Sequence, residues 1–211
     1  MGKRLLDLFC KAGGASMGYH RAGFEVVGVD IEPQPNYPFE FIQADAMTFP
    51  LDGFDAIHAS PPCQAYAKVT DWRGSRSDHP MLIDAVRERL KGLMYVIENV
   101  PDARGELINP IMLCGSQFGL SVRRHRFFEI PSIGFTLRPP CQHRSTDAAF
   151  DHGGKQSETE YAKALGCDWM TGVEARQAIP PAYTQWIGTQ LLRHCDPPPR
   201  LRQAKPAEFR K

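Results

Sequence analysis

Short apolar runs alternate with segments of helical periodicity along most of the chain. Nearly continuous apolar runs predict strands, over residues 4–10, 24–30, 39–43, 54–59, 93–97 and 127–130. Apolar positions at helical spacing predict helices, over residues 15–21, 81–91, 108–114, 173–178 and 183–194. Strands that alternate with helices and are apolar on both faces predict an α/β fold with a doubly wound, mostly parallel sheet.

The regular alternation stops after residue 130. Residues 131–172 are rich in Pro and Gly and have no long periodic segment, which indicates a short, irregular insert. We therefore expect one domain from residues 1–130 and 173–195, interrupted by this insert. Residues 196–211 are rich in Pro, Lys and Arg, so we expect a basic and mobile tail.

Composition changes this picture little. With 211 residues, 42% hydrophobic residues and a net charge of +1, the chain has no global basicity that would indicate nucleic acid binding. No apolar run approaches the length of a membrane span, so we expect a cytoplasmic protein that does not bind membranes.

The cysteines are scattered at long, irregular spacings, which predicts reduced thiols and no disulfide framework. Cys141, His143, His152 and Cys167 do not follow the spacing of a zinc finger. We expect no metal site.

Chemically versatile side chains follow two of the predicted strands. Pro61 and Pro62 make a stiff turn that carries Cys63, and Glu98 ends a later strand. Because the carboxyl ends of parallel strands meet at one edge of the sheet, these side chains should lie close together. Cys63 alone could equally be a small buried hydrophobe.

A nucleotide-like ligand is indicated at the same edge. Gly13 and Gly14 lie between the first strand and the first helix, and Asp30 ends the next strand. Glycines at a helix amino end allow close approach of a ligand, and a carboxylate at this offset can accept the hydroxyls of a ribose. A plain strand-to-helix connection remains the alternative.

These motifs together resemble the cytosine-5 DNA methyltransferase family. The residues that carry the resemblance are Asp7-Leu8-Phe9 with Gly13-Gly14, Asp30, Asp45, Pro61-Pro62-Cys63-Gln64, Glu98-Asn99-Val100, Arg124 with Arg126, and Ile179-Pro180-Pro181 through Gly188. The resemblance covers most of the chain and implies a Rossmann-like methyltransferase fold. It also implies a small phage-borne or bacterial enzyme, in the host cytoplasm if phage-encoded, that methylates DNA, as in restriction-modification systems.

The resemblance implies the following catalytic roles. Cys63 would add to a cytosine flipped out of the duplex, Glu98 would contact its ring nitrogen and amine, and Arg126 would neutralise developing charge and lower the pKa of the thiol. Arg124, Asn99 and Gln64 would complete this group.

The resemblance also implies binding residues. S-adenosylmethionine would be held by Phe9, Cys10, Lys11, Gly13, Gly14, Asp30, Ile31, Asp45, Ala46, Pro61, Gly188 and Thr189. DNA would be held by basic residues of the loop over residues 65–80 and of the insert, namely Lys68, Arg73, Arg76, Arg138 and Arg144.

Three features depart from the family pattern. Lys11 replaces a glycine, Val122 replaces a glutamine, and the insert is much shorter than a usual target-recognition domain. Lys11 could pair with a carboxylate of the chain or with that of carboxy-S-adenosylmethionine, in which case the transferred group would be carboxymethyl. The short insert leaves open RNA, single-stranded DNA or a deoxycytidine nucleotide as substrate, and a catalytically silent binding protein is the alternative of another class. We expect a monomer or a weak homodimer.

Overall fold

A single mixed sheet forms the centre of the molecule in the computed structural model, which describes residues 2–72, 74–130, 136–142 and 158–195. The strands are β1 (Lys3–Leu8), β2 (Phe24–Asp30), β3 (Glu40–Gln43), β4 (Ala56–Ala59), β5 (Tyr95–Asn99), β6 (Ile111–Leu113) and β7 (Arg126–Glu129). The α-helices are α1 (Gly14–Ala22), α2 (Ile83–Arg89), α3 (Glu158–Leu165), α4 (Gly172–Gln177) and α5 (Pro181–Cys195).

The sheet has the order β3-β2-β1-β4-β5-β7-β6. β1 to β5 are parallel, whereas β7 runs antiparallel to both β5 and β6. The predicted doubly wound, mostly parallel sheet is therefore confirmed. Because β4 and β5 are direct neighbours, the turns that follow them meet at one edge of the sheet.

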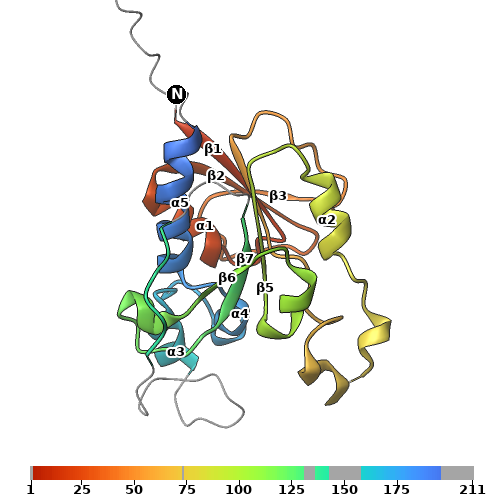
Figure 1. The fold of residues 1–211 in the computed structure, drawn as a ribbon, viewed down its shortest axis with the longest axis vertical. Helices are drawn as coiled ribbons and strands as arrows, with labels where there is room; N and C mark the ends of the chain where they lie inside the picture. Colours follow the sequence, from red (N-terminus) through yellow and green to blue (C-terminus); the bar gives the residue numbers. More distant parts are fainter. Residues whose placement is uncertain (1, 73, 131–135, 143–157, 196–211) are drawn as a thin grey trace, which may run out of the picture.

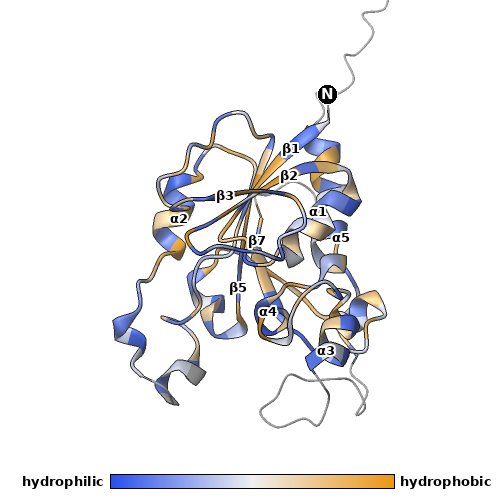
Figure 2. Ribbon diagram, turned by 180° about the vertical axis from the view of Figure 1, so that it is seen from behind, coloured by the Kyte–Doolittle hydropathy of each residue, from blue (hydrophilic) through white to orange (hydrophobic). Residues whose placement is uncertain are grey.

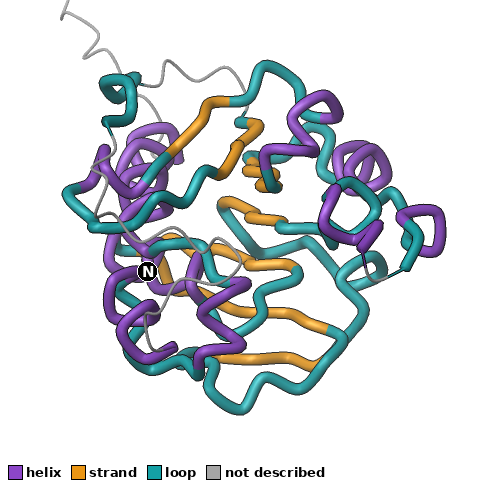
Figure 3. The backbone as a smooth tube through the Cα atoms, turned by 90° about the horizontal axis from the view of Figure 1, so that it is seen from below, coloured by secondary structure: helices purple, strands orange, loops and turns teal. Residues whose placement is uncertain are grey.

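Helices cover both faces of the sheet, as Figures 1 and 3 show. α1 and α5 pack together on one face and bury an apolar cluster that includes Leu5, Tyr183 and Ile187. α2 covers the other face over a second cluster that includes Leu6 and Ile83. Figure 2 shows the resulting pattern, with hydrophobic strands at the centre. Burial of these residues explains why the strands read as continuous apolar runs.

One predicted element has the wrong type. We expected a helix over residues 108–114, but residues Ile111–Leu113 form the edge strand β6. β6 pairs with β7, and Leu113 is buried against the sheet. A short apolar run does not by itself distinguish a strand from a buried helix, so pairing with β7 decided the outcome.

The insert contains more regular structure than its sequence pattern indicated. α3 lies within it and packs against α4, and the two helices bury a third apolar cluster with Val122 and Ala12. The helices predicted at residues 173–178 and 183–194 are confirmed as α4 and α5, each beginning one or two residues earlier. The predicted tail lies outside the described residues.

No helix in the described part of the chain combines the length and the apolar character needed to cross a bilayer.

Candidate active site

The turn after β4 holds Cys63 at the carboxyl edge of the sheet. Pro61 is buried, and its carbonyl accepts a hydrogen bond of 3.0 Å from the side chain of Asn99 on β5. The carbonyl of Cys63 accepts hydrogen bonds from the backbone N–H groups of Tyr66 and Ala67. The turn is thus fixed from both sides, and Asn99 links it to β5. Gln64, which follows Cys63, is exposed.

Glu98 and Arg126 form a buried ion pair on neighbouring strands. Arg126 Nε lies 3.0 Å from Glu98 Oε1, and both side chains are largely shielded from solvent. The Arg126 N–H does not point along this line, so Glu98 Oε1 is a buried acceptor without a hydrogen bond among the described residues. A buried acceptor of this kind is costly unless a partner arrives, which makes it a candidate contact for a ligand.

The pKa values of Glu98 and Cys63 are both raised, in each case mainly by burial. Burial raises the pKa of Glu98, and Arg126 only partly offsets this effect. Burial and the neighbouring charge of Glu98 also raise the pKa of the Cys63 thiol, despite the opposing effect of Arg126. Arg126 lowers the thiol pKa, as expected, but the net shift is upward because desolvation of the thiolate is the larger effect. Arg126 itself has a pKa lowered by burial to about 10 and stays charged at neutral pH.

A chain of buried polar groups, which the sequence pattern did not indicate, leads away from Glu98. It begins at Ser60, whose side chain lowers the pKa of Glu98 against the larger effect of burial. The Ser60 hydroxyl also lies 2.9 Å from His58 Nε2, and His58 Nδ1 lies 2.9 Å from the hydroxyl of Tyr19 on α1. Burial lowers the pKa of His58 to about 3, so the imidazole is neutral. The polar residue His58 within the otherwise apolar β4 is the only signal that could have revealed this chain.

Arg124 connects the sheet to the insert. Its guanidinium donates hydrogen bonds to the hydroxyl of Tyr161 on α3 and to the carbonyl of Arg176 on α4. Arg124 is buried, and Nε has no hydrogen-bond partner among the described residues. Val122 is fully buried in the apolar cluster beneath α3 and α4. The departure from glutamine at this position therefore has a packing explanation.

Asp30 and Lys11 lie together at the end of β2. The backbone N–H of Lys11 donates a hydrogen bond of 3.0 Å to the buried carboxylate of Asp30. The Lys11 ammonium lies 2.7 Å from Glu32 and 3.6 Å from Asp30. Burial alone would lower the pKa of Lys11, but these carboxylates raise it above its ordinary value. The carboxylate partners of Lys11 thus belong to the chain itself.

The glycine turn is needed for packing within the protein. Gly13 has a φ of +81°, and a Cβ there would lie 3.0 Å from the ring of Tyr37. A Cβ on Gly14 would lie 2.5 Å from the carbonyl oxygen of Ile179, just before α5. Both residues are close to the predicted cofactor site, but the space beside them is filled by protein atoms.

A buried network lies under this turn. Ser16 on α1 donates a hydrogen bond to Asp7 on β1, and its hydroxyl lies 2.7 Å from that of Tyr37. Burial raises the pKa of Asp7 to about 7. The Asp7 of the sequence motif therefore fixes β1 to the following helix.

The other predicted cofactor residues divide into two groups. Phe9, Cys10, Ile31, Asp45, Ala46 and Pro61 lie in the turns after β1, β2, β3 and β4. Ile31 is 68% exposed although it is large and apolar, and it is adjacent to Asp30. Ala46 is a core residue, and the Asp45 carboxylate accepts a hydrogen bond from the backbone of Met47.

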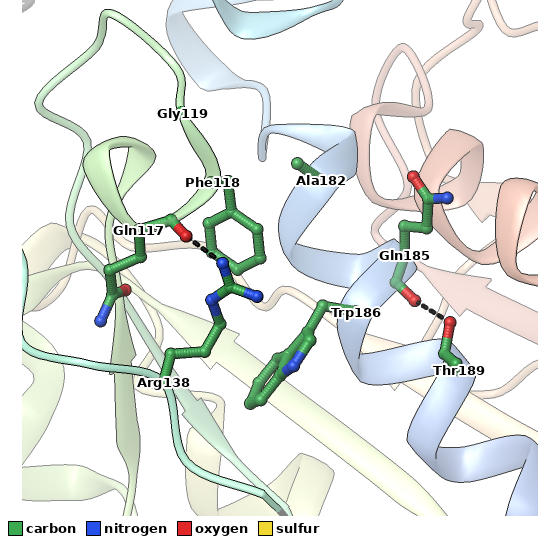
Figure 4. A pocket seen from close by; sticks show the side chains of 8 residues that line it. All are labelled: Gln117, Phe118, Gly119, Arg138, Ala182, Gln185, Trp186 and Thr189. Carbon is green, nitrogen blue, oxygen red and sulfur yellow. Dashed lines mark hydrogen bonds between the residues drawn. The ribbon is translucent and has the colours of Figure 1, made fainter.

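Gly188 and Thr189 are not brought to this edge. A Cβ on Gly188 would meet Ala22 and Tyr19, so this glycine allows the close packing of α5 against α1. Thr189 donates a hydrogen bond of 2.8 Å to the carbonyl of Gln185 within α5 and lines a separate pocket of about 470 Å³ (Figure 4). Both residues lie about two turns into α5, whereas Ala178 and Ile179, which are close to Gly14, precede this helix.

The predicted DNA contacts are scattered. Arg138 lies over the ring of Phe118 in the pocket of Figure 4, with its guanidinium carbon 4.3 Å from the ring centroid. Arg76 pairs with Asp71 at 2.9 Å in the loop that extends below α2 in Figure 1. Lys68 is exposed in the same loop. Arg73 and Arg144 lie outside the described residues.

Known proteins are similar to this chain in sequence. The family model for C-5 cytosine-specific DNA methylase matches residues 3–107. The type II methyltransferase M.AquIA of a Picosynechococcus strain is 30% identical over 145 residues, which cover 56% of this chain and 58% of that protein. The type II methyltransferase M1.HphI of Haemophilus parahaemolyticus is 33% identical over 92 residues, which cover 36% of this chain and 25% of that protein.

A solved structure shares the fold. The methyltransferase EhMeth of Entamoeba histolytica has a TM-score of 0.63 at 12% identity, over 93% of this chain and all of that chain. The chain spans just over half of M.AquIA and a quarter of M1.HphI. The family match includes the Cys63 turn, Glu98 and Asp30, and it assigns residues 3–107 of the chain to the cytosine-5 DNA methyltransferase family.

Proposed function

We propose that this protein transfers a methyl group from S-adenosylmethionine to ring position 5 of cytosine in DNA, with Cys63 as the nucleophile. The observation that carries the proposal is the group formed by Cys63, Glu98 and Arg126 at one sheet edge. A thiol, a buried carboxyl and a guanidinium are the groups that addition to a pyrimidine ring needs.

The residues at the ends of β1 and β2 fit S-adenosylmethionine. The buried carboxylate of Asp30 suits the hydroxyls of a ribose. Ile31, with 68% of its surface exposed, offers an apolar face for a purine ring. When bound, the cofactor supplies an electrophilic methyl group.

Cys63 would act first. Ring position 5 of cytosine is a weak nucleophile, so the Cys63 sulfur forms a bond to carbon 6 and the electrons of the 5,6 double bond become available at carbon 5. Once carbon 5 carries the methyl group, loss of its proton to a base restores the double bond. The same electron movement breaks the bond to Cys63 and releases the thiolate.

Glu98 and Arg126 would stabilise the ring while charge develops. The raised pKa of Glu98 favours its protonated form, which can donate a hydrogen bond to ring nitrogen 3. Glu98 Oε1, which has no hydrogen bond among the described residues, can accept one from the exocyclic amine. Arg126 stays charged and offsets the negative charge that builds on the ring.

The cytosine would reach Cys63 only after leaving the base stack. Ring atoms of a paired base are not accessible to a side chain on a stiff turn, so the target nucleotide must be flipped out. The exposed Gln64 and the loop that follows it would contact the strand beside the flipped base.

A covalent trap tests this proposal. Duplex DNA that contains 5-fluorocytosine should form an adduct with the full chain in the presence of S-adenosylmethionine, because fluorine at carbon 5 cannot leave as a proton. We expect the adduct to survive denaturing electrophoresis and peptide mapping to place it on Cys63. Cys63→Ser should abolish it, whereas Cys195→Ser, at the end of α5, should not.

Parallel reactions distinguish the alternatives. Tritiated methyl transfer to duplex DNA, single-stranded DNA, RNA and deoxycytidine nucleotides identifies the substrate. Transfer to RNA alone, or unchanged transfer by Cys63→Ser, would contradict the proposal. Binding of S-adenosylhomocysteine without transfer to any of these would indicate a silent binding protein.

A carboxylated cofactor has no specific support. Lys11 is the residue that would recognise its extra carboxylate, and this ammonium already pairs with Glu32 and Asp30. The methyl group is therefore the better proposal for the transferred group, and mass spectrometry of the product nucleosides distinguishes it from carboxymethyl.

A further inference from the structure

Three side chains from separate segments converge on the far side of β7 from Glu98. Cys114 directly follows β6, His125 directly precedes β7, and Cys141 lies in the segment over residues 136–142. One ligand atom from each of the three lies within 4.8 Å of the other two. Cys141 Sγ and His125 Nε2 are 3.7 Å apart. Cys114 is fully buried, and the other two are partly buried.

These separations suit a tetrahedral metal ion. Zinc binds cysteine sulfur at about 2.3 Å and histidine nitrogen at about 2.0–2.1 Å, so tetrahedral angles place sulfur about 3.6 Å from nitrogen and the two sulfurs about 3.8 Å apart. The observed 3.7 Å between Cys141 and His125 matches the first value. No separation among the three ligand atoms exceeds 4.8 Å, so a contraction of at most about 1 Å would bring them to tetrahedral distances.

Hydrogen bonds hold the segments that carry both cysteines in place. The Ser116 hydroxyl donates a hydrogen bond of 3.6 Å to Cys114 Sγ and accepts one of 3.1 Å from the backbone N–H of Gln142. The Gln117 side chain accepts from the backbone of Cys114 and donates to the carbonyl of Pro139. Hydrogen bonds to ligand sulfurs and a fixed loop geometry are typical of metal sites.

We propose that Cys114, His125 and Cys141 bind a structural Zn²⁺ ion. Two thiolates and an imidazole are donors that zinc prefers, and three protein ligands are enough for a specific site. The described residues do not assign the fourth ligand. This proposal departs from our expectation of no metal site, because the ligands are 11 and 16 residues apart in the sequence and follow no finger spacing.

The ion would join three segments next to the candidate active site. It would link the loop-connected end of the β6–β7 hairpin to residues 136–142 of the insert. The carbonyl of His125 accepts a hydrogen bond of 2.8 Å from Arg126, so a metal on His125 would also fix the backbone that orients this arginine.

Metal analysis of the full, untagged chain tests the proposal. We expect about one zinc ion per chain after gel filtration. Replacement by Co²⁺ should give the visible absorption of a tetrahedral ion and a thiolate-to-metal charge-transfer band. Cys141→Ser and His125→Gln should weaken Co²⁺ binding by about 100-fold or more. Cys167→Ser, which changes a buried cysteine outside this group, should bind Co²⁺ like the wild type.

A measurement on the wild-type chain avoids any dependence on variant folding. Removal of the ion with a strong chelator should lower the melting temperature, and added Zn²⁺ should restore it, because metal binding contributes to folding free energy. No bound metal together with no tetrahedral Co²⁺ spectrum would overturn the proposal. Detection of a disulfide between Cys114 and Cys141 in protein alkylated at lysis would also overturn it.

Discussion

Lys11 is the residue at which this chain departs most clearly from its family, and two opposing effects decide what its replacement by glycine does. Lys11 has a φ of +45°, in the left-handed region. A residue with a side chain costs roughly 1–2 kcal/mol in this conformation. Glycine removes that cost. Its greater conformational freedom in the unfolded chain, however, lowers the free energy of unfolding by about 0.4–1 kcal/mol.

The ion pair of Lys11 opposes this gain. The lysine side chain is 42% exposed and that of Glu32 is 67% exposed, so solvent screens the pair. Pairs of this kind contribute about 0.2–1 kcal/mol. Together the three effects predict that Lys11→Gly changes the free energy of unfolding by between about −1 and about +1.4 kcal/mol.

Lys11→Gln is the matched control, because it removes the charge and keeps the unfavourable φ. It should lower the free energy of unfolding by about 0.2–1 kcal/mol. Urea unfolding measures both variants, and Lys11→Gly should be at least as stable as Lys11→Gln. A loss of more than about 2 kcal/mol in Lys11→Gly would refute the reasoning, because neither the ion pair nor the backbone entropy is that large.

Cofactor binding gives a second readout of the same variants. Asp30 is oriented by the backbone N–H of Lys11, which glycine keeps. Titration calorimetry should therefore show nearly unchanged affinity for S-adenosylhomocysteine. If the ammonium instead binds a carboxylated cofactor, both variants should weaken binding of that cofactor by about 10- to 100-fold, the worth of a charge-assisted hydrogen bond.

Three further predictions follow from the site and its support. Because burial and Glu98 raise the pKa of Cys63, its alkylation by iodoacetamide should still accelerate above about pH 8.5, the ordinary thiol pKa, and a plateau below that pH would contradict this. Arg87→Met removes the bidentate partner of buried Glu129 and should lower the free energy of unfolding in urea by about 3–5 kcal/mol. The control Lys91→Met, which breaks an exposed ion pair, should lower it by less than about 0.5 kcal/mol. Gly18→Ala places a methyl group against the backbone of α5 and should lower stability by about 1–3 kcal/mol, and an unchanged melting temperature would exclude that contact.

For most of the sheet, the order of strands and helices along the chain could be predicted from the sequence alone. Apolar runs and helical periodicity are local properties of the sequence. A strand that is buried on both faces of the sheet needs apolar residues at nearly every position, so its pattern can be recognised without the tertiary structure. The positions of Cys63, Glu98 and Asp30 at strand ends follow from the same pattern, because all parallel strands end at one edge.

Other features depended on contacts between distant segments. The run from Ile111 to Leu113 became a strand only because β7 was available to pair with it. Gly188 packs against α1 instead of the cofactor edge, since the direction of α5 decides where its residues lie.

The electrostatic features were also decided by tertiary structure. The pKa of Cys63 depends on how completely the turn is desolvated, which no motif states. The partner of Lys11 proved to be Glu32, and the group of Cys114, His125 and Cys141 joins segments whose spacing carries no metal signature. The sequence shows residue types and the ends of strands. The burial of a side chain, its interaction partners and the meeting of residues from distant segments arise only when those segments pack together.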